Sequence, residues 1–184
     1  MDTPSELRTD RLVLRRWLAA DRQPFAALNS DPMVMEHFPA PLTRAESDAF
    51  VDRIEDHFAL HGWGLWAVQI AAGDTFIGYV GLSPATFAAH FTPAVEVGWR
   101  LAHEHWGQGY ATEAARAAIT DVFARSLADE IVSFTATTNL RSQQVMQKLG
   151  MRRDPHDDFE HPRVAVGHPL RPHVLYRLPR AEWT

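Results

Sequence analysis

The clearest alternation of apolar and polar residues lies in residues 94–101, whose sequence is AVEVGWRL. A period of two is typical of a β-strand with one buried face. The apolar residues share one face of this predicted strand: Val95, Val97, Trp99 and Leu101. The opposite face carries Glu96, Gly98 and Arg100, so the two charged side chains of the strand lie on the same side.

Helical spacing is strongest in residues 109–125, where apolar residues recur three and four positions apart. A second helix is predicted over residues 43–60, because Thr43 and Glu46 have the spacing of a capping box. Two shorter helices are predicted after the candidate N-cap residues Asp21 and Asn139.

Six other short apolar segments predict strands: residues 11–17, 65–71, 76–82, 131–136, 151–153 and 174–178. Residues 154–172 are rich in proline, histidine and acids, and predict a long surface loop. No repeat or linker divides the chain, so residues 1–184 are expected to form one domain.

Composition excludes several classes of partner and site. The net charge of -5, from 18 basic and 23 acidic residues, argues against a nucleic-acid partner. No apolar run is long enough for a membrane span, and no signal peptide is present, so a cytoplasmic protein is expected. The absence of cysteine excludes disulfides and a thioester acyl-enzyme. The late histidines follow no regular ligand spacing, so no metal site is expected: His156, His161, His168 and His173.

The candidate chemistry begins in residues 106–112, with the sequence WGQGYAT, between the alternating strand and the long helix. A glycine-rich turn at a helix N-terminus presents unpaired amides beside the positive end of the helix dipole, which suits a pyrophosphate. Gly107 and Gly109 let the backbone approach the anion, Ala111 keeps the first turn narrow, and Thr112 adds a hydroxyl. The turn matches neither a P-loop nor the dinucleotide fingerprint.

Longer segments resemble a known family. The runs VEVGWRLAHEHWGQGYATEAARAAI and TTNLRSQQVMQKLGM resemble the acetyl-CoA-binding motifs of the GNAT superfamily, in the branch of ribosomal-protein N-terminal acetyltransferases. The opening TDRLVLRRW and the closing HVLYRLPRAEW resemble the same branch. The resemblance implies an α+β fold with a mixed, mostly antiparallel twisted sheet of about seven strands. Helices would cover both faces, and a splayed central strand pair would bind acetyl-CoA.

The resemblance also implies a cofactor site. The amides of one loop would hold the pyrophosphate of acetyl-CoA: Gly107, Gln108, Gly109, Tyr110, Ala111 and Thr112. The backbone at the end of the preceding strand would bind the pantetheine arm and the acetyl carbonyl: Trp99, Arg100 and Leu101. Trp106 departs from the superfamily, which often has Gln or Arg at that position, although the branch commonly has an aromatic residue there.

Catalytic roles follow from the same resemblance, each with a structural alternative. Asn139 and Ser142 match an Asn-x-x-Ser pattern, in which Asn139 would bind cofactor or substrate and Ser142 would protonate the departing thiolate. The alternative is an ordinary helix N-cap. Glu96 would take a proton from the amine through water, and the alternative is an ion pair with Arg100. Tyr176 is a second candidate proton donor, with packing as the alternative.

The predicted reaction is direct transfer of an acetyl group from acetyl-CoA to a primary amine in a ternary complex. The acceptor is either a protein N-terminus, such as that of a ribosomal protein, or a small-molecule or antibiotic amine. A non-catalytic acyl-CoA sensor is a further alternative, and the branch suggests a homodimer. Acceptor recognition is expected in the helix over residues 43–60 and in residues 154–172, where the acids either face water or attract a cationic acceptor.

Overall fold

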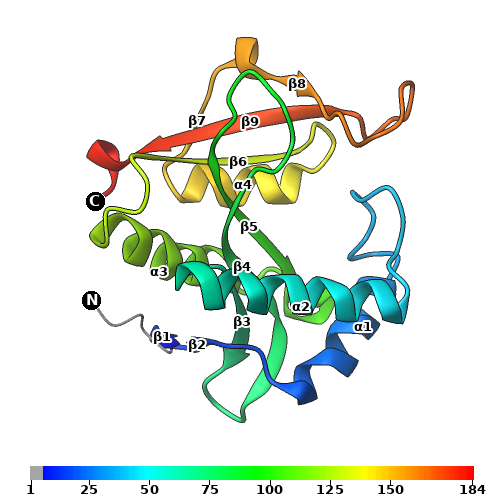
Figure 1. Cartoon of the computed structure of the whole chain (residues 1–184), viewed down its shortest axis with the longest axis vertical. Coiled ribbons are helices and arrows are strands. Elements are labelled where there is room, and N and C mark those ends of the chain that lie inside the picture. Colours follow the sequence, from blue (N-terminus) through cyan, green and yellow to red (C-terminus); the bar gives the residue numbers. More distant parts are fainter. Residues whose placement is uncertain (1–5) are drawn as a thin grey trace.

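The computed structural model describes residues 6–184, which form one mixed sheet with helices on both of its faces. The main path through the sheet has the order β1-β2-β3-β4-β5-β6-β9-β7, and β8 pairs with β9 (Figure 1). The strands are β1 (Glu6–Arg8), β2 (Leu12–Arg15), β3 (Leu65–Ile70), β4 (Thr75–Pro84), β5 (Val95–Leu101), β6 (Glu130–Ala136), β7 (Arg152–Arg153), β8 (Phe159–Glu160) and β9 (Pro172–Pro179).

One strand pair is different from the others. Every neighbouring pair is antiparallel except β5 and β6, which are parallel and are paired only at Val95–Ile131 and Glu96–Val132. Beyond Glu96 the two strands separate, while β4 and β5 stay paired along all of β5. The sheet therefore opens at its centre, between a lower half containing β1 to β4 and an upper half containing β6 and β9 (Figure 1).

Four α-helices cover the sheet: α1 (Arg22–Ser30), α2 (Arg44–His61), α3 (Tyr110–Ala124) and α4 (Leu140–Lys148). Consecutive residues of a strand point to opposite faces. Arg100 bonds Asn29 of α1, whereas Trp99 bonds Ser142 of α4, so α1 and α4 lie on opposite faces of β5. Arg116 of α3 bonds the last carbonyl of α4, which places these two helices side by side.

Local signals set the ends of the helices. Thr43 and Glu46 form the predicted capping box of α2, and Gly62 ends that helix in a left-handed conformation. Asn139 caps α4 by accepting a bond from the amide of Ser142. Asp21 precedes α1 but gives it no side-chain cap; its carboxylate instead accepts the Leu18 amide and pairs with Arg15.

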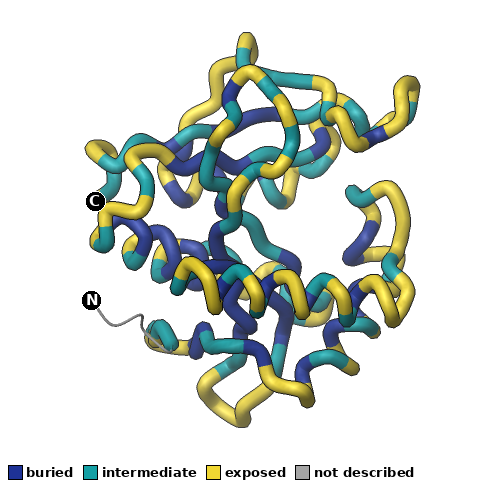
Figure 2. The backbone as a smooth tube through the Cα atoms, viewed as in Figure 1, coloured by how far each residue is buried: buried dark blue, intermediate teal, exposed yellow. Residues whose placement is uncertain are grey.

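The predicted fold class is confirmed, with nine strands where about seven were expected. The additional strands are the short β1 and β8, which carry too few residues to show a period of two. The main core fills the space between the sheet and the helices, and the solvent side of α2 is exposed along its length (Figure 2). That residues 1–184 form one domain stays a prediction.

The expected surface loop over residues 154–172 is wrong in part. Phe159 lies in β8 and packs against Phe134, with ring centroids 5.6 Å apart, and Val164 is buried. The Phe159 contacts come from β6 and β9, which are distant in sequence, whereas the local pattern is dominated by prolines and acids. The acids of this segment are ion-paired, for example Asp157 with Arg177 at 2.6 Å.

Candidate active site

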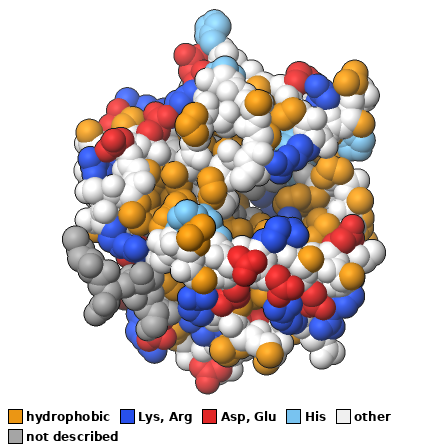
Figure 3. Space-filling model, in the orientation of Figure 1, with side chains coloured by type: hydrophobic (Ala, Val, Ile, Leu, Met, Phe, Trp, Pro, Cys, Tyr) orange, Lys and Arg blue, Asp and Glu red, His pale blue; other side chains and the backbone are white. Residues whose placement is uncertain are grey.

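A cleft of about 540 Å³ opens where β5 and β6 separate. At the start of the separation, the buried Ser133 of β6 donates a hydrogen bond of 2.9 Å to the carbonyl oxygen of Val97. Past this bond the two strands are no longer paired, and side chains from both line the cleft. A space-filling view shows a hollow near the middle of the molecule, bordered by hydrophobic and basic side chains (Figure 3).

The backbone carbonyls of Trp99, Arg100 and Leu101, at the end of β5, do not all point in the same direction. The carbonyls of Val97 and Leu101 point toward the opening, where they accept bonds from Ser133 and from the Trp106 indole at 2.9 and 2.8 Å. Trp99 lies between them in the same register, so its backbone faces the cleft as well. The Arg100 carbonyl points the other way, toward Gly78 of β4, where an added Cβ would lie 2.1 Å from it.

The predicted phosphate loop lies at the end of the cleft, where α3 begins. Gly107 and Gly109 have φ angles of +75° and +82°, which is the left-handed region that glycine adopts at little cost. Gly109 is the N-cap of α3 and supplies no side-chain cap, so the first amides of the helix stay without partners among the described residues. Six consecutive residues therefore offer an anion site at the positive end of the helix dipole: Gly107, Gln108, Gly109, Tyr110, Ala111 and Thr112.

Arg11 holds this loop in place. Its guanidinium donates to the Gln108 carbonyl at 3.0 Å, lies 4.7 Å from the centre of the Tyr110 ring and pairs with Glu113. Glu113 also accepts a bond of 2.6 Å from Thr9, and these bonds lower the pKa of its carboxyl against the effect of burial. Glu113 is the one acid in the first turn of α3, and Arg11 thus compensates its negative charge beside the predicted anion site.

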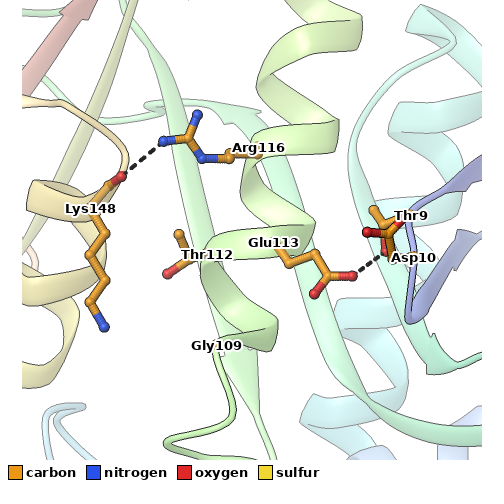
Figure 4. A pocket seen from close by; sticks show the side chains of 7 residues that line it. All are labelled: Thr9, Asp10, Gly109, Thr112, Glu113, Arg116 and Lys148. Carbon is orange, nitrogen blue, oxygen red and sulfur yellow. Dashed lines mark hydrogen bonds between the residues drawn. The ribbon is translucent and has the colours of Figure 1, made fainter.

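A second, shallow cavity of about 520 Å³ adjoins the loop on the outer side of α3 (Figure 4). Its walls include Gly109 and Thr112, two basic side chains, Arg116 and Lys148, and two acids, Asp10 and Glu113. Lys148 also lines the main cleft, so the two cavities share both Lys148 and the α3 N-terminus. The two basic side chains lie on one side of α3 and the two acids on the other (Figure 4).

Asn139 and Ser142 meet at the wall of the cleft that belongs to α4. The Ser142 hydroxyl oxygen accepts bonds from the Asn139 amide at 3.1 Å and from the Trp99 indole at 3.3 Å. Asn139 also donates to Thr135 at 2.9 Å and caps the helix. Because the Ser142 oxygen accepts both of these bonds, its hydroxyl proton is free to be donated into the cleft. The helix-cap role and the predicted catalytic role are therefore compatible.

Glu96 faces the cleft without a charged partner. Among residues 6–184 its carboxylate has no ion pair and no hydrogen bond, and the predicted alternative of a pair with Arg100 is wrong. Burial raises the pKa of Glu96 to about 8. The side chain is only partly exposed, and its Oε1 leans over Gly98, 3.8 Å from where a Cβ would stand. A carboxylate with a raised pKa in a cleft has the properties of a general base.

Arg100 bonds α1 instead. Its Nη1 donates to Asn29 at 2.6 Å, and its guanidinium lies 4.1 Å from the centre of the Phe38 ring. The side chain is 8% exposed, and its Nε is buried without a hydrogen-bond partner. Arg100 borders the cleft on the same face as Glu96.

The remaining wall of the cleft comes from segments that no motif marked. Residues 33–39, between α1 and α2, supply one side, and His161, Arg163 and His173 supply the other. None of the cleft-lining residues comes from α2, so acceptor recognition by the helix over residues 43–60 stays a prediction without support from the cleft. Ser133 and Thr135 stand two positions apart in the apolar segment of β6, and this spacing could have identified them as polar residues of the cleft wall.

The structure thus brings nearly all of the predicted site residues to one cleft. The residues that line it are Glu96, Trp99, Arg100, Leu101, Gly107, Gly109, Tyr110, Ala111, Thr112, Asn139 and Ser142. Gln108 lies in the same loop, but its side chain does not border the cleft. Tyr176 lies outside the cleft, where its buried hydroxyl contacts Gln143 and Gln147 of α4, in agreement with a packing role.

No helix in residues 6–184 combines the length and apolar character needed to cross a membrane. In the same residues, no group of three or more His, Cys, Asp or Glu side chains is arranged to hold a metal ion.

Comparison with known proteins agrees with this geometry. Residues 11–152 match the family model for the acetyltransferase (GNAT) domain. FsC-acetyl coenzyme A-N(2)-transacetylase from Aspergillus fumigatus is 29% identical, over 96% of this chain and 77% of its own length. A GNAT-family acetyltransferase structure from Bacillus anthracis has a TM-score of 0.78 at 23% identity, covering 96% of this chain and 99% of its own. The ribosomal-protein-S5-alanine acetyltransferase of Vibrio fischeri has a TM-score of 0.72 at 17% identity, covering 98% and 100%.

Proposed function

The chain belongs to the GNAT family of acetyltransferases, and from this premise we propose that it transfers an acetyl group from acetyl-CoA directly to a primary amine. The observation that carries the proposal is the position of the α3 loop at the end of the opening between β5 and β6. One end of the cleft offers unpaired amides for phosphates, and the other holds a carboxylate and a hydroxyl. A long thioester with an anionic end fits such an arrangement.

We assign the cofactor side as follows. The amides of residues 107–112 bind the pyrophosphate, and Arg116 and Lys148 contribute positive charge beside them. Among the three residues predicted at the end of β5, the backbone of Trp99 is the best placed for the pantetheine arm, because the Leu101 carbonyl is occupied by Trp106 and the Arg100 carbonyl faces β4. When bound, acetyl-CoA supplies the activated acetyl group.

The two proton transfers are assigned to the two polar groups of the cleft. An amine attacks only in its neutral form, so Glu96, as carboxylate, takes a proton from the acceptor ammonium, directly or through water. As the carbon–sulfur bond breaks, Ser142 donates its proton to the thiolate sulfur and recovers one from solvent. Trp99 and Asn139 hold the Ser142 oxygen in place during this step. No covalent acyl-enzyme is needed.

The acceptor has two supported candidates. A protein N-terminus is supported by the structural likeness to the ribosomal-protein-S5-alanine acetyltransferase, and a small molecule by the sequence likeness to the FsC transacetylase. The unpaired Glu96 favours an enzyme over a sensor module, because a sensor has no use for a base. We further propose a cytoplasmic location and a homodimer, with no nucleic-acid partner.

The proposal is tested by measuring the binding of acetyl-CoA and the release of free CoA thiol from it. The acceptors are a panel of N-terminal peptides and of small amines. Binding together with amine-dependent thiol release is the expected result. Failure to bind acetyl-CoA would remove the basis of the assignment, and binding without thiol release on any amine would favour the sensor module.

A further inference from the structure

Arg100 is a buried cation without an acidic partner. No ion pair involves it among residues 6–184, its Nη1 bonds only the neutral Asn29, and its Nε is unsatisfied. A charged group buried in this way is costly unless something compensates it. The aromatic ring of Phe38, 4.1 Å away, offsets part of the cost. The remaining terminal nitrogen, Nη2, has no hydrogen-bond partner in the described chain and is available to a ligand.

Tyr79 is the second unpartnered polar group on this wall. It pairs with Arg100 across β4 and β5, and its ring centre is 5.7 Å from the guanidinium carbon. The residue is 7% exposed and lines the cleft, and its hydroxyl makes no hydrogen bond to the described residues. Two donors of buried residues, Arg100 Nη2 and the Tyr79 hydroxyl, thus face the cleft without an acceptor among the described residues.

The charge of the cleft favours an anion at this position. Its described lining contains a single acid, Glu96, and four Arg and Lys side chains: Arg141 is paired with Glu36, Lys148 lies beside the phosphate loop, and Arg100 and Arg163 have no acidic partner among the described residues. Glu96 leans along the strand over Gly98, in the direction of Arg100, but stays separate from it. This positive wall lies in a protein whose net charge is -5, so overall charge does not account for it.

We propose that Arg100 and Tyr79 bind a carboxylate of the acceptor, and that the acceptor is therefore a small amino acid-like molecule, with its amine at Glu96. A planar carboxylate matches the fork of a guanidinium and accepts the tyrosine hydroxyl as well. The inference rests on the proposed acetyl transfer and selects between its two acceptors. A peptide N-terminus has an amide where an amino acid has its carboxylate, and an amide would leave the Arg100 charge uncompensated.

Matched pairs of acceptors test the inference on the full chain. Each of the twenty common L-amino acids is compared with its carboxamide, and a set of N-terminal tripeptides is added. Thiol release gives kcat/KM for every compound, and calorimetric titration into CoA-saturated protein gives its affinity whether or not it is acetylated. We expect the affinity and the kcat/KM of each acid to exceed those of its amide by about ten- to a hundredfold, the range of charge-assisted hydrogen bonds.

Two variants locate the preference. Arg100→Gln should abolish the difference between acid and amide, and Tyr79→Phe should reduce it about threefold to tenfold, as expected for one lost hydrogen bond. Because the Tyr79 hydroxyl bonds no described residue, Tyr79→Phe is expected to fold normally, and it keeps the test open if Arg100→Gln unfolds. Arg53→Gln is the control, since Arg53 is exposed on α2 and lies outside the cleft.

The possible outcomes separate the two claims. Selective binding and acetylation of acids, reduced by Tyr79→Phe and unchanged by Arg53→Gln, would support both. Acetylation of amides or tripeptides at rates equal to or above those of acids would overturn the carboxylate site and leave acetyl transfer intact. Selective binding of acids without thiol release would support the carboxylate site and overturn acetyl transfer. Absence of both binding and acetylation for every acid would overturn the inference.

Discussion

The two ends of the cleft are built in different ways. The backbone groups of the cofactor end come from one continuous stretch, the end of β5, the loop and the first turn of α3, within residues 99–112, and the side chains of Arg116 and Lys148 lie beside it. The acceptor end is assembled from side chains of β4, β5, residues 33–39 and residues 161–173, which are far apart in sequence. The first end is rich in backbone donors held by glycine, whereas the second is made of side chains such as Tyr79 and Arg100.

The difference shows how a shared reaction can coexist with different acceptors. A site made of amides tolerates side-chain changes around it, because its donors belong to the main chain. A site made of side chains on connecting segments changes with each substitution, and such segments vary readily in length and sequence. We therefore expect variants at the two ends to have separate effects, on the cofactor or on the acceptor.

The largest effect is expected for Glu96→Gln, which removes the base where the two ends meet. General base catalysis contributes about a hundredfold to ten-thousandfold, so kcat should fall by that order. The affinity for acetyl-CoA, measured by titration, should stay unchanged. A variant that keeps the wild-type rate would assign the proton transfer to another group.

The pH dependence sharpens the same prediction. Burial raises the pKa of Glu96 to about 8, so the carboxylate form increases as pH rises, and the rate should rise through about pH 8. Between these two pKa values, 4.5 in the unfolded chain and about 8 in the folded state, folding takes up a proton at Glu96. The contribution of Glu96 to the free energy of unfolding is therefore complete below pH 4.5 and is lost as the pH rises toward 8. Glu96→Gln should reduce that loss, measured as Tm against pH.

At the cofactor end, Gly109→Ala should weaken acetyl-CoA binding about tenfold, because a left-handed conformation costs alanine roughly 1–2 kcal/mol. Gly73→Ala is the matched control: Gly73 has a φ of +92° with nothing within 4 Å of an added Cβ, and it lies in the distant β3–β4 turn. In Gly109→Ala the loop is expected to leave this conformation, so the cost appears as a raised Kd, whereas Gly73→Ala should lower the Tm and leave the Kd unchanged. Equal Kd values for the two variants would contradict the loop assignment.

This contrast also explains what the sequence could predict. The alternation of β5 and the helical period of α3 are local patterns, and both elements appear within a residue or two of their predicted bounds. The capping box of α2 was visible for the same reason. The loop between them follows from glycine spacing, so the cofactor end could be described before the structure was known. That it binds acetyl-CoA is still a proposal.

The acceptor end could not be predicted, because its residues come together only through tertiary contacts. Nothing near Arg100 in the sequence indicates that Asn29 will bond it, or that Phe38 will cover it. The ion pair of Arg100 with Glu96, the structural alternative for Glu96, rested on local spacing alone, and the bond from Arg100 to Asn29 of α1 replaces it. In the same way, Val164 is buried in a segment whose prolines and acids indicated a surface loop.

A smaller effect is expected for Ser142→Ala, which removes the proton donor while keeping the helix cap on Asn139. The thiolate can still take a proton from water, so kcat should fall about tenfold, toward the lower limit of general acid effects. The Tm should fall modestly, since the Trp99 indole and the Asn139 amide each lose one hydrogen bond, typically worth about 1 kcal/mol. A lower Tm with an unchanged kcat would instead indicate a structural role.

The smallest effect concerns the acceptor end alone. Burial, followed by the charges of His173, Arg163 and Arg171, lowers the pKa of His161 to about 4. The folded state thus keeps His161 neutral where the unfolded chain protonates near pH 6.5, so stability is present above that pH and is lost as pH falls toward 4. His161→Phe keeps an aromatic ring beside Phe87. Between pH 7 and 5 its free energy of unfolding should fall by about 1–2 kcal/mol less than that of the wild type.

The control for this prediction is His156→Phe, because the His156 side chain is 96% exposed and lies outside the cleft. Chemical unfolding at several pH values gives both stability curves. If the two variants follow the same curve, His161 is not held neutral by the cleft wall. If His161→Phe resists acid and still binds acetyl-CoA as the wild type does, the wall of the acceptor end can be altered without disturbing the cofactor end, as its separate construction requires.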